Sequence, residues 1–203
     1  MTFTEELYIK TKPSHTIVDK HPFVSLIRKN KIAGEMYINF NKICIYEIQK
    51  VLKLNNQELL KELHRDIEIP DMYISETLNQ LLIHCKKYPL ESSYQFYLGL
   101  LFGGNMLKKL LPTDHDFLTY SNPKQLISKF KSYLCDNISK SQEDLFIDNV
   151  NDAYKLVEKL FDEFYNKIEK QSLNIKETSL LDVQEISSLD GGPGTYPDPD
   201  NFI

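Results

Sequence analysis

One histidine near the N-terminus stands in a context that suits metal ligation. His15 lies in the segment TKPSHTIVD, with Lys12 nearly one helical turn before it and Asp19 one turn after it. A neutral imidazole is a common iron ligand, and a neighbouring lysine would suit the anionic edge of a bound metal macrocycle. A lone histidine is also common as a structural or solvated side chain, so the spacing alone leaves both interpretations open. Other histidines have polar or ordinary helical neighbours: His64, His84 and His115.

The glycines gather in one apolar stretch. Of seven glycines, three lie in YLGLLFGGNMLKKLL, residues 97–111. Gly99 and Gly103 are one turn apart on one face of the expected helix, and Gly104 widens the bare strip. Each costs up to about 1 kcal/mol relative to alanine, so the strip needs a reason. Taken alone, it favours the close packing of another helix. The second interpretation is a planar ligand, such as a tetrapyrrole, lying on the backbone.

Other catalytic patterns are absent from the sequence. It contains no glycine-rich phosphate loop, no HExxH, no GxSxG, and no ExxH pair that would indicate a di-iron bundle. The three cysteines, Cys44, Cys85 and Cys135, lack CxxC spacing. We interpret them as free thiols of a reducing compartment, without disulfides or a zinc site.

The elements that position these residues are expected to be helices. The chain has 203 residues, 41% of them hydrophobic, which is enough for one domain with a sizeable core. Apolar residues recur at i, i+3 and i+4 nearly throughout, and the scarcity of glycine argues against a turn-rich β fold. Pro22 indicates a short helix with His21 near its cap, and Ser75 indicates another helix start. A break is expected at Ala33–Gly34.

Charge and composition change near residue 171. The net charge is −5, and residues 171–203 hold six acidic residues and one lysine, which leaves 23 acidic and 23 basic residues before them. This segment ends in DGGPGTYPDPDNFI, which is rich in Pro, Gly and Asp and cannot bury a core. The sequence therefore predicts a helical domain over residues 1–170 and a disordered acidic tail over residues 171–203.

The body of the chain is electrically neutral, which gives no basic field for nucleic acid. No apolar run approaches the roughly 20 residues that span a bilayer. The N-terminus also lacks the basic-then-apolar order of a signal peptide. We expect a soluble cytoplasmic protein without a membrane anchor or a nucleic-acid partner.

Four stretches resemble, in this order along the chain, the heme oxygenase family. The first is TKPSHTIVD, similar to the motif TKxxHTxxE, and the second is ELHRD, residues 62–66, similar to an ELHR segment. The third is YQFYLGLLFGGNMLKK, residues 94–109, which resembles YTRYLGDLSGGQxLKK. The fourth is NDAYKLVEKLFDEF, residues 151–164, which resembles the family's closing helix. The likeness covers roughly residues 5–168.

The resemblance implies an all-α heme oxygenase fold around a bound heme b. His15 would be the proximal ligand of the iron, and Gly99, Gly103 and Gly104 would form the distal wall beside Leu100. The other heme-binding residues would be Lys12, Tyr94, Lys131 and Tyr154. The implied reaction is oxidation of heme to biliverdin, CO and ferrous iron. Electrons would come from an external reductase or ferredoxin, because nothing in the sequence indicates a flavin or nicotinamide site.

Three apolar residues depart from the family's distal motif. Leu100 stands where the family has an aspartate that organises a proton-delivering water network, Phe96 replaces an arginine, and Phe102 replaces a serine. These departures support an alternative, a non-catalytic heme- or bilin-binding protein of the same fold. A third interpretation, a helical protein that has lost heme, leaves the presence of His15 and the glycines unexplained. Pro13 is expected to break or restart the first helix.

Overall fold

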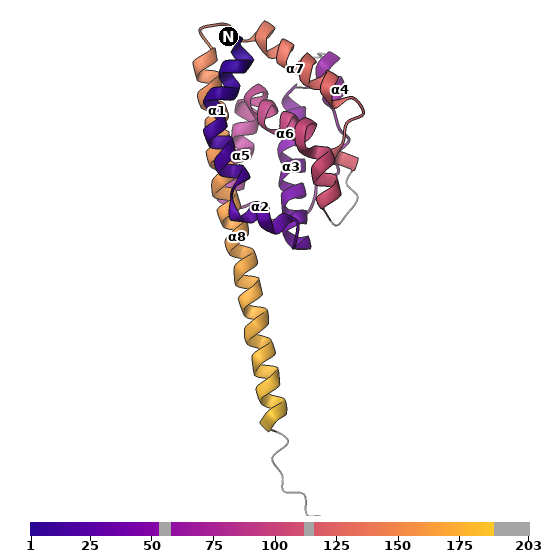
Figure 1. The fold of residues 1–203 in the computed structure, drawn as a ribbon, viewed down its shortest axis with the longest axis vertical. Coiled ribbons are helices and arrows are strands. Elements are labelled where there is room, and N and C mark those ends of the chain that lie inside the picture. Colours follow the sequence, from indigo (N-terminus) through magenta and orange to yellow (C-terminus); the bar gives the residue numbers. More distant parts are fainter. Residues whose placement is uncertain (53–57, 112–115, 189–203) are drawn as a thin grey trace, which may run out of the picture. The chain divides into compact units, whose positions relative to one another are not determined.

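The computed structural model of the chain describes residues 1–52, 58–111 and 116–188 (Figure 1). Within these ranges the regular elements are helices and there is no strand, which confirms the predicted all-α fold. They are α1 (Phe3–Asp19), α2 (Pro22–Ile27), α3 (Lys31–Leu52), α4 (Glu58–Leu63), α5 (Glu76–Lys87), α6 (Pro89–Leu110), the 3-10 turn η2 (Asp116–Leu118), α7 (Pro123–Asn137) and α8 (Glu143–Ser188). The chain divides into two units, residues 1–165 and 166–203, and the candidate site lies in the first.

The core of the first unit is built on α3, against which α2, α5 and α6 pack. Aromatic rings join three helices at its centre. The ring of Phe161 on α8 lies 4.9 Å from that of Phe23 on α2 and 5.7 Å from that of Phe40 on α3. All three are buried, and each buried phenyl side chain stabilises the fold by about 1.5–3 kcal/mol. This cluster fixes α8 on the core, and α8 carries part of the candidate site.

A buried polar network holds the segment after α4 against α3 and α6. The Gln49 side chain accepts from the backbone N–H of Arg65 at 2.8 Å and donates to its carbonyl at 2.9 Å. The Tyr97 hydroxyl donates to the same Gln49 oxygen at 3.1 Å. The Arg65 guanidinium lies 3.6 Å from the ring centre of Tyr120 and donates to the carbonyl of Thr119. The ELHRD segment, which contains Arg65, therefore serves the packing of the domain.

The first helix is continuous through Pro13, contrary to the predicted break. A proline inside a helix costs about 3 kcal/mol, and contacts on both sides of Pro13 offset that cost. Thr2 closes a capping box with Glu5 at the start of α1. Beyond the proline, the Ser14 hydroxyl donates to Asn151 Oδ1 of α8 at 2.8 Å. Along its inner face α1 also buries three side chains: Phe3, Leu7 and Thr11.

The predicted break at Ala33–Gly34 is also wrong, because both residues lie inside the first turn of α3. The side chain of Asn30 accepts from the backbone N–H of Ala33 at 3.1 Å, and its carbonyl accepts from that of Gly34 at 3.1 Å. The Asn30 side chain thus supplies a partner for one N–H group that a helix start leaves open, and its carbonyl accepts the first hydrogen bond within the helix. The helix that begins after Asn30 therefore continues through Gly34 without a break.

Two other predicted helix starts are confirmed. His21 precedes α2, and its Nδ1 accepts from the backbone N–H of Phe23 at 3.1 Å. Ser75 precedes α5, and its hydroxyl accepts from the backbone N–H of Leu78 at 3.2 Å. Both caps join residues two or three positions apart, which is why local patterns were enough to find them.

The last helix extends beyond the predicted boundary at residue 171, since α8 continues to Ser188. Residues 172–188 contain neither glycine nor proline, so the helix can add residues at little cost once its first turns have formed. The predicted tail over residues 189–203 falls outside the described residues. Although α8 is long, neither it nor another described helix is apolar enough to cross a membrane.

Candidate functional site

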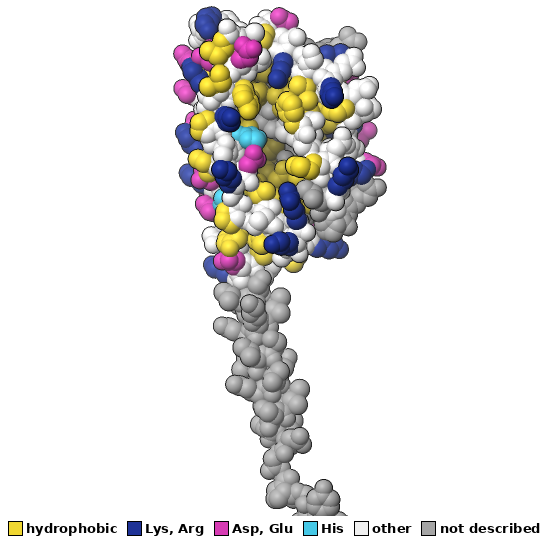
Figure 2. Space-filling view, viewed as in Figure 1, with side chains coloured by type: hydrophobic (Ala, Val, Ile, Leu, Met, Phe, Trp, Pro, Cys, Tyr) yellow, Lys and Arg dark blue, Asp and Glu magenta, His cyan; other side chains and the backbone are white. Residues whose placement is uncertain are grey.

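One face of the first unit is hollowed where α1 and α6 lie (Figures 1 and 2). Figure 2 shows hydrophobic side chains in the hollow, a histidine with an acidic side chain at its edge, and lysine or arginine side chains around its rim. The same two helices leave large apolar residues in water, among them Phe102 and Met106 on α6, which are 65% and 58% exposed. A hollow with apolar walls and a few charged groups is typical of a ligand site.

His15 lies on α1 with its imidazole about half exposed, at 49% of the side-chain area. Its Nδ1 is 2.9 Å from Oδ2 of Asp19, one helical turn further on. The ring also meets Tyr154 of α8 edge to face, with the two ring centres 5.6 Å apart. Asp19 occupies one ring nitrogen as an acceptor, so the Nε2 lone pair is the one available to a ligand. The spacing that singled out His15 therefore corresponds to a real contact.

Two tyrosines from different helices accompany His15. Tyr154 is buried, and burial raises the pKa of its phenol. Tyr94 on α6 is partly buried, which raises its pKa also, while a hydrogen bond with the Thr11 side chain of α1 acts in the opposite direction. Both phenols therefore stay protonated at neutral pH and can donate hydrogen bonds. Through Thr11, Tyr94 links α6 to the face of α1 that carries His15.

The three glycines of α6 do not share one role. A Cβ atom added to Gly99 or Gly103 would have nothing within 4 Å, so no other described helix packs against either residue. A Cβ on Gly104 would overlap the backbone carbonyl of Leu118 in η2. Gly104 thus permits a close backbone contact, whereas the backbone at Gly99 and Gly103 faces open space. The interpretation as a helix-packing strip holds only for Gly104.

The apolar departures from the family motif occupy different environments. Leu100 is only 3% exposed, and Phe96 is buried, with its ring centre 6.2 Å from that of Phe40 on α3. Phe102 is instead exposed at the surface of α6. Leu100 and Phe96 therefore belong to the core in this structure, and Phe102 presents an apolar ring beside Gly103.

Two lysines were predicted to pair with an anionic ligand, and both have exposed side chains without a described ion-pair partner. Lys131 on α7 places its Nζ 5.9 Å from the ring centre of Phe102. It also lies close enough to Glu5 of α1 to help lower the pKa of that carboxyl, after the hydrogen bonds from Thr2. Lys12 places its Nζ 5.8 Å from the ring centre of Tyr8. Neither ammonium group forms an ion pair of 4 Å or less with a described residue, so both can bind an anion.

Comparisons with known proteins find structural likeness only. No family model matches the chain, and no curated protein matches it. Heme oxygenase-1 from the cyanobacterium Synechocystis, solved in complex with heme, superposes with a TM-score of 0.62 and 18% identity, covering 89% of this chain and 100% of that one. The heme oxygenase from Leptospira interrogans gives a TM-score of 0.59 and 17% identity, over 80% and 100%. The chain has the heme oxygenase fold.

On this heme oxygenase fold, the structure brings some of the predicted site residues together and separates others. His15, Tyr94 and Tyr154 are linked through ring contacts and electrostatic interactions that involve α1, α6 and α8. Lys131 meets the glycine helix at Phe102. Gly104 lies against the backbone of η2, so it serves the packing of α6 and not the site.

Sequence reasoning missed two residues that position this part of the heme oxygenase fold. Thr11 contacts Tyr94, and Asn151 binds Ser14 next to the histidine. Thr11 lies four residues before His15, so the helical period puts both on one face of α1. That spacing could have identified Thr11. Nothing local in the sequence indicates Asn151, because it lies 137 residues from its partner.

Proposed function

We propose that this chain is a heme oxygenase, which binds heme b through His15 and cleaves it to biliverdin, CO and ferrous iron. Electrons would be supplied by an external reductase or ferredoxin in the cytoplasm. The observation that carries the proposal is the His15–Asp19 pair: an accessible imidazole with one nitrogen bound to a carboxylate, within a heme oxygenase fold. This is the arrangement in which a histidine presents its second nitrogen to a metal.

The residues present fit a heme. His15 offers a nitrogen ligand, and the open backbone at Gly99 and Gly103 leaves room for a flat group. The macrocycle is mostly apolar, as are the exposed side chains of Phe102 and Met106. Its two propionates are anionic and match free ammonium groups at the edge of the site, for which Lys12 and Lys131 are the candidates.

Each side chain then has a definite task. Asp19 accepts a hydrogen bond from the Nδ1–H group of His15. This fixes the tautomer, so that the lone pair of Nε2 can bind the iron. The ring of Tyr154 contacts the imidazole edge to face and limits its rotation. Tyr94 interacts with the Thr11 side chain and would contact one edge of the heme. When bound, heme supplies the oxygen chemistry, while the protein orients it and controls access to water.

On the glycine side, no acidic side chain stands at position 100 to hold water, because that residue is a buried leucine. In our proposal, backbone carbonyls at Gly99 and Gly103 hold the water molecules that deliver protons. Backbone acceptors bind water but do not titrate, so we expect slower turnover than a carboxylate would allow.

The second candidate is a non-catalytic heme- or bilin-binding protein. The apolar set Phe96, Leu100 and Phe102 favours it, since it provides no titratable group for proton delivery. Both candidates predict that the protein binds heme, and they differ only in whether the bound heme is consumed.

The test is a hemin titration followed by reduction. One equivalent of hemin should give a shifted Soret band, and ascorbate with catalase should then produce a biliverdin band as the Soret band decays. A stable Soret band under reductant selects the binding protein. No Soret shift on adding hemin contradicts both candidates.

Substitution of the histidines provides the matched control. His15→Ala should remove the low-spin Soret spectrum, whereas His64→Ala, which changes a histidine outside the site, should keep it. Equal spectra for the two variants would show that another group binds the iron.

A further inference from the structure

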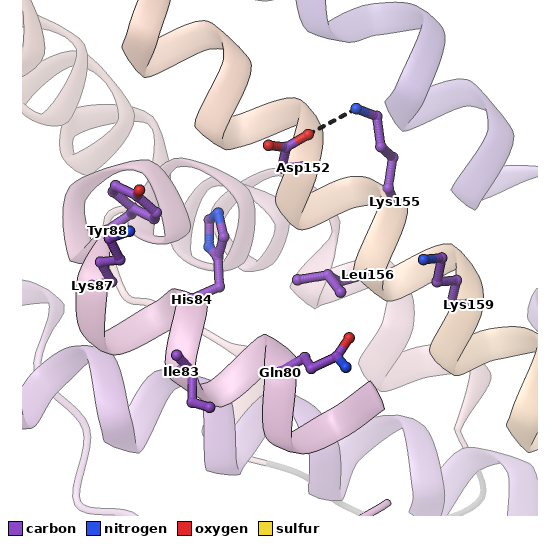
Figure 3. Close-up of a pocket in the computed structure, with 9 residues that line it drawn as sticks. All are labelled: Gln80, Ile83, His84, Lys87, Tyr88, Asp152, Lys155, Leu156 and Lys159. Atoms are coloured by element: carbon purple, nitrogen blue, oxygen red, sulfur yellow. Dashed lines mark hydrogen bonds and ion pairs between the residues drawn. The ribbon is translucent and has the colours of Figure 1, made fainter. Parts of the chain in front are cut away.

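A second cavity, of about 400 Å³, lies between α5 and α8 and shares no residue with the site around His15. Figure 3 shows its side chains, which come from residues 80–87 of α5, from Tyr88 after it, and from residues 152–159 of α8. Ile83 and Leu156 form its apolar part, and most of the remaining wall is polar or charged. A cavity of this size falls within the range of small-molecule sites.

Three lysines and one aspartate line this cavity. Lys155 Nζ is 2.7 Å from Asp152 Oδ1, so this pair is close to neutral. Lys159 forms no ion pair with a described residue. Lys87 Nζ lies 4.9 Å from the ring centre of Tyr88, a contact that leaves its charge uncompensated. The cavity therefore holds about two unneutralised positive charges.

Neutral polar groups complete the wall. The Gln80 amide donates to Glu76 at 3.0 Å and has a second N–H to give. His84 is only 9% exposed, and its Nδ1 lies 3.4 Å from the Ser92 hydroxyl. Its Nε2 makes no hydrogen bond of good geometry with the described residues, although the Asn149 backbone is near. This atom is buried next to the Asn149 backbone, so it is not a contact for a ligand in the cavity.

We propose that this cavity binds a small molecule through a phosphate monoester group. Phosphate monoesters carry close to two negative charges at neutral pH, which would balance the net charge of the cavity as a whole. Lysine is a common point-charge partner of phosphate. Tyr88, Ile83 and Leu156 would contact the organic part of the molecule. A monocarboxylate would leave one of the two charges uncompensated.

The full-length protein can be tested without heme, so the result is independent of the oxidative function. Amide chemical shifts are followed by NMR while inorganic phosphate, and then glycerol 3-phosphate, replaces chloride at constant ionic strength. We expect saturable shifts at the backbone of residues 80–88 and 152–159. Shifts that never saturate, or that spread over the whole surface, would overturn the proposal.

Three substitutions distinguish a specific binding site from general attraction between lysine and phosphate. Lys159→Gln should weaken binding about tenfold, whereas Lys124→Gln, which changes an exposed lysine of α7 outside the cavity, should leave it unchanged. Asp152→Asn should strengthen binding several-fold, because it frees Lys155 from its carboxylate partner. Equal effects of the two lysine variants, or no gain in the asparagine variant, would contradict the site.

A lipid headgroup carries the same phosphate chemistry. Vesicles that contain phosphatidic acid therefore form a separate arm of the experiment. Binding of glycerol 3-phosphate, with or without vesicle binding, supports the proposal. Binding to the vesicles alone contradicts a small-molecule site.

Discussion

The Nδ1 atom of His15 and the Oδ2 atom of Asp19 lie 2.9 Å apart on successive turns of α1. A second pair of the same kind joins His21 of α2 to Asp162 of α8, with Nε2 and Oδ1 3.1 Å apart. Only the first pair has a half-exposed imidazole, since the His21 side chain is largely buried. A third described pair, His64 and Asp66, is wider, with Nε2 and Oδ1 3.7 Å apart. Among these described pairs, the first leaves its imidazole most accessible to a ligand.

Asp19→Asn should lower heme affinity about 10- to 100-fold, because the imidazole loses the partner that fixes its tautomer and its orientation. The affinity is measured by titrating hemin and following the Soret band. Asp162→Asn is the matched control and should leave the affinity unchanged. If both variants bind heme as the unchanged protein does, Asp19 has no part in ligation.

Alanine at Gly99 or at Gly103 should stabilise the protein without ligand by up to about 1 kcal/mol, because alanine favours the helix and the new methyl group meets nothing. The same substitutions should weaken heme binding, since the methyl group takes up space above the backbone. Urea unfolding and hemin titration measure the two effects. Lower stability in both variants would show that the space is not open.

Gly104→Ala should behave in the opposite way. Its methyl group would overlap the carbonyl of Leu118, which is backbone and can move only with η2. Overpacking of this kind costs typically 1–3 kcal/mol, and urea unfolding should show it. Unfolding at the same urea concentration as the unchanged protein would mean that η2 shifts freely.

Leu100→Asp should increase the biliverdin formed per bound heme, because a carboxylate at this position can hold water and transfer protons. Burying that group should also destabilise the protein by roughly 2 kcal/mol or more. Activity is therefore expressed per bound heme, from the Soret band. Leu100→Asn, which is similar in size but cannot titrate, should give less gain. No difference between the two variants would contradict proton delivery from position 100.

Glu91 on α6 should make stability depend on pH. Burial raises the pKa of its carboxyl above the ordinary value of 4.5, although a hydrogen bond from Asn149 opposes the shift. The folded state holds the proton more tightly than the unfolded state, so stability falls as pH rises from 4.5 through the raised pKa. Glu91→Gln keeps an acceptor for Asn149 and should remove this part of the fall. Urea midpoints at pH 4 and pH 7 should differ less in the variant, and an unchanged difference would contradict the assignment.

Gln49 should contribute more to stability than its partner Tyr97. Tyr97→Phe removes one hydrogen bond and should cost about 1 kcal/mol. Gln49→Ala leaves the backbone N–H and carbonyl of Arg65 and the Tyr97 hydroxyl without a partner, and should cost roughly 3 kcal/mol or more. Urea unfolding of the two variants gives the comparison. Equal losses would indicate that water replaces the amide.

The features that could be predicted from the sequence depend on neighbouring residues. The caps at His21 and Ser75 and the contact between His15 and Asp19 all follow from spacings of four residues or fewer. The breaks predicted at Pro13 and Gly34 were wrong, because contacts with α8 and the cap at Asn30 outweigh the local preference.

The glycines show why the rest of the site could not be read from sequence. Gly103 and Gly104 are adjacent in the same motif, yet one faces open space and the other touches η2. The difference depends on Leu118, which comes from another part of the chain. The roles proposed for Tyr94, Tyr154 and Lys131 depend on the family resemblance, since no local pattern marks these residues.

The open backbone at Gly99 and Gly103 has a thermodynamic consequence. Any ligand that fills this space binds the folded chain and not the unfolded one, so its concentration enters the folding equilibrium by mass action. At 100 times the dissociation constant, the ligand adds about 2.7 kcal/mol to the free energy of unfolding. That is a large part of the stability of a typical domain. The amount of folded protein in the cell would thus follow the supply of the ligand.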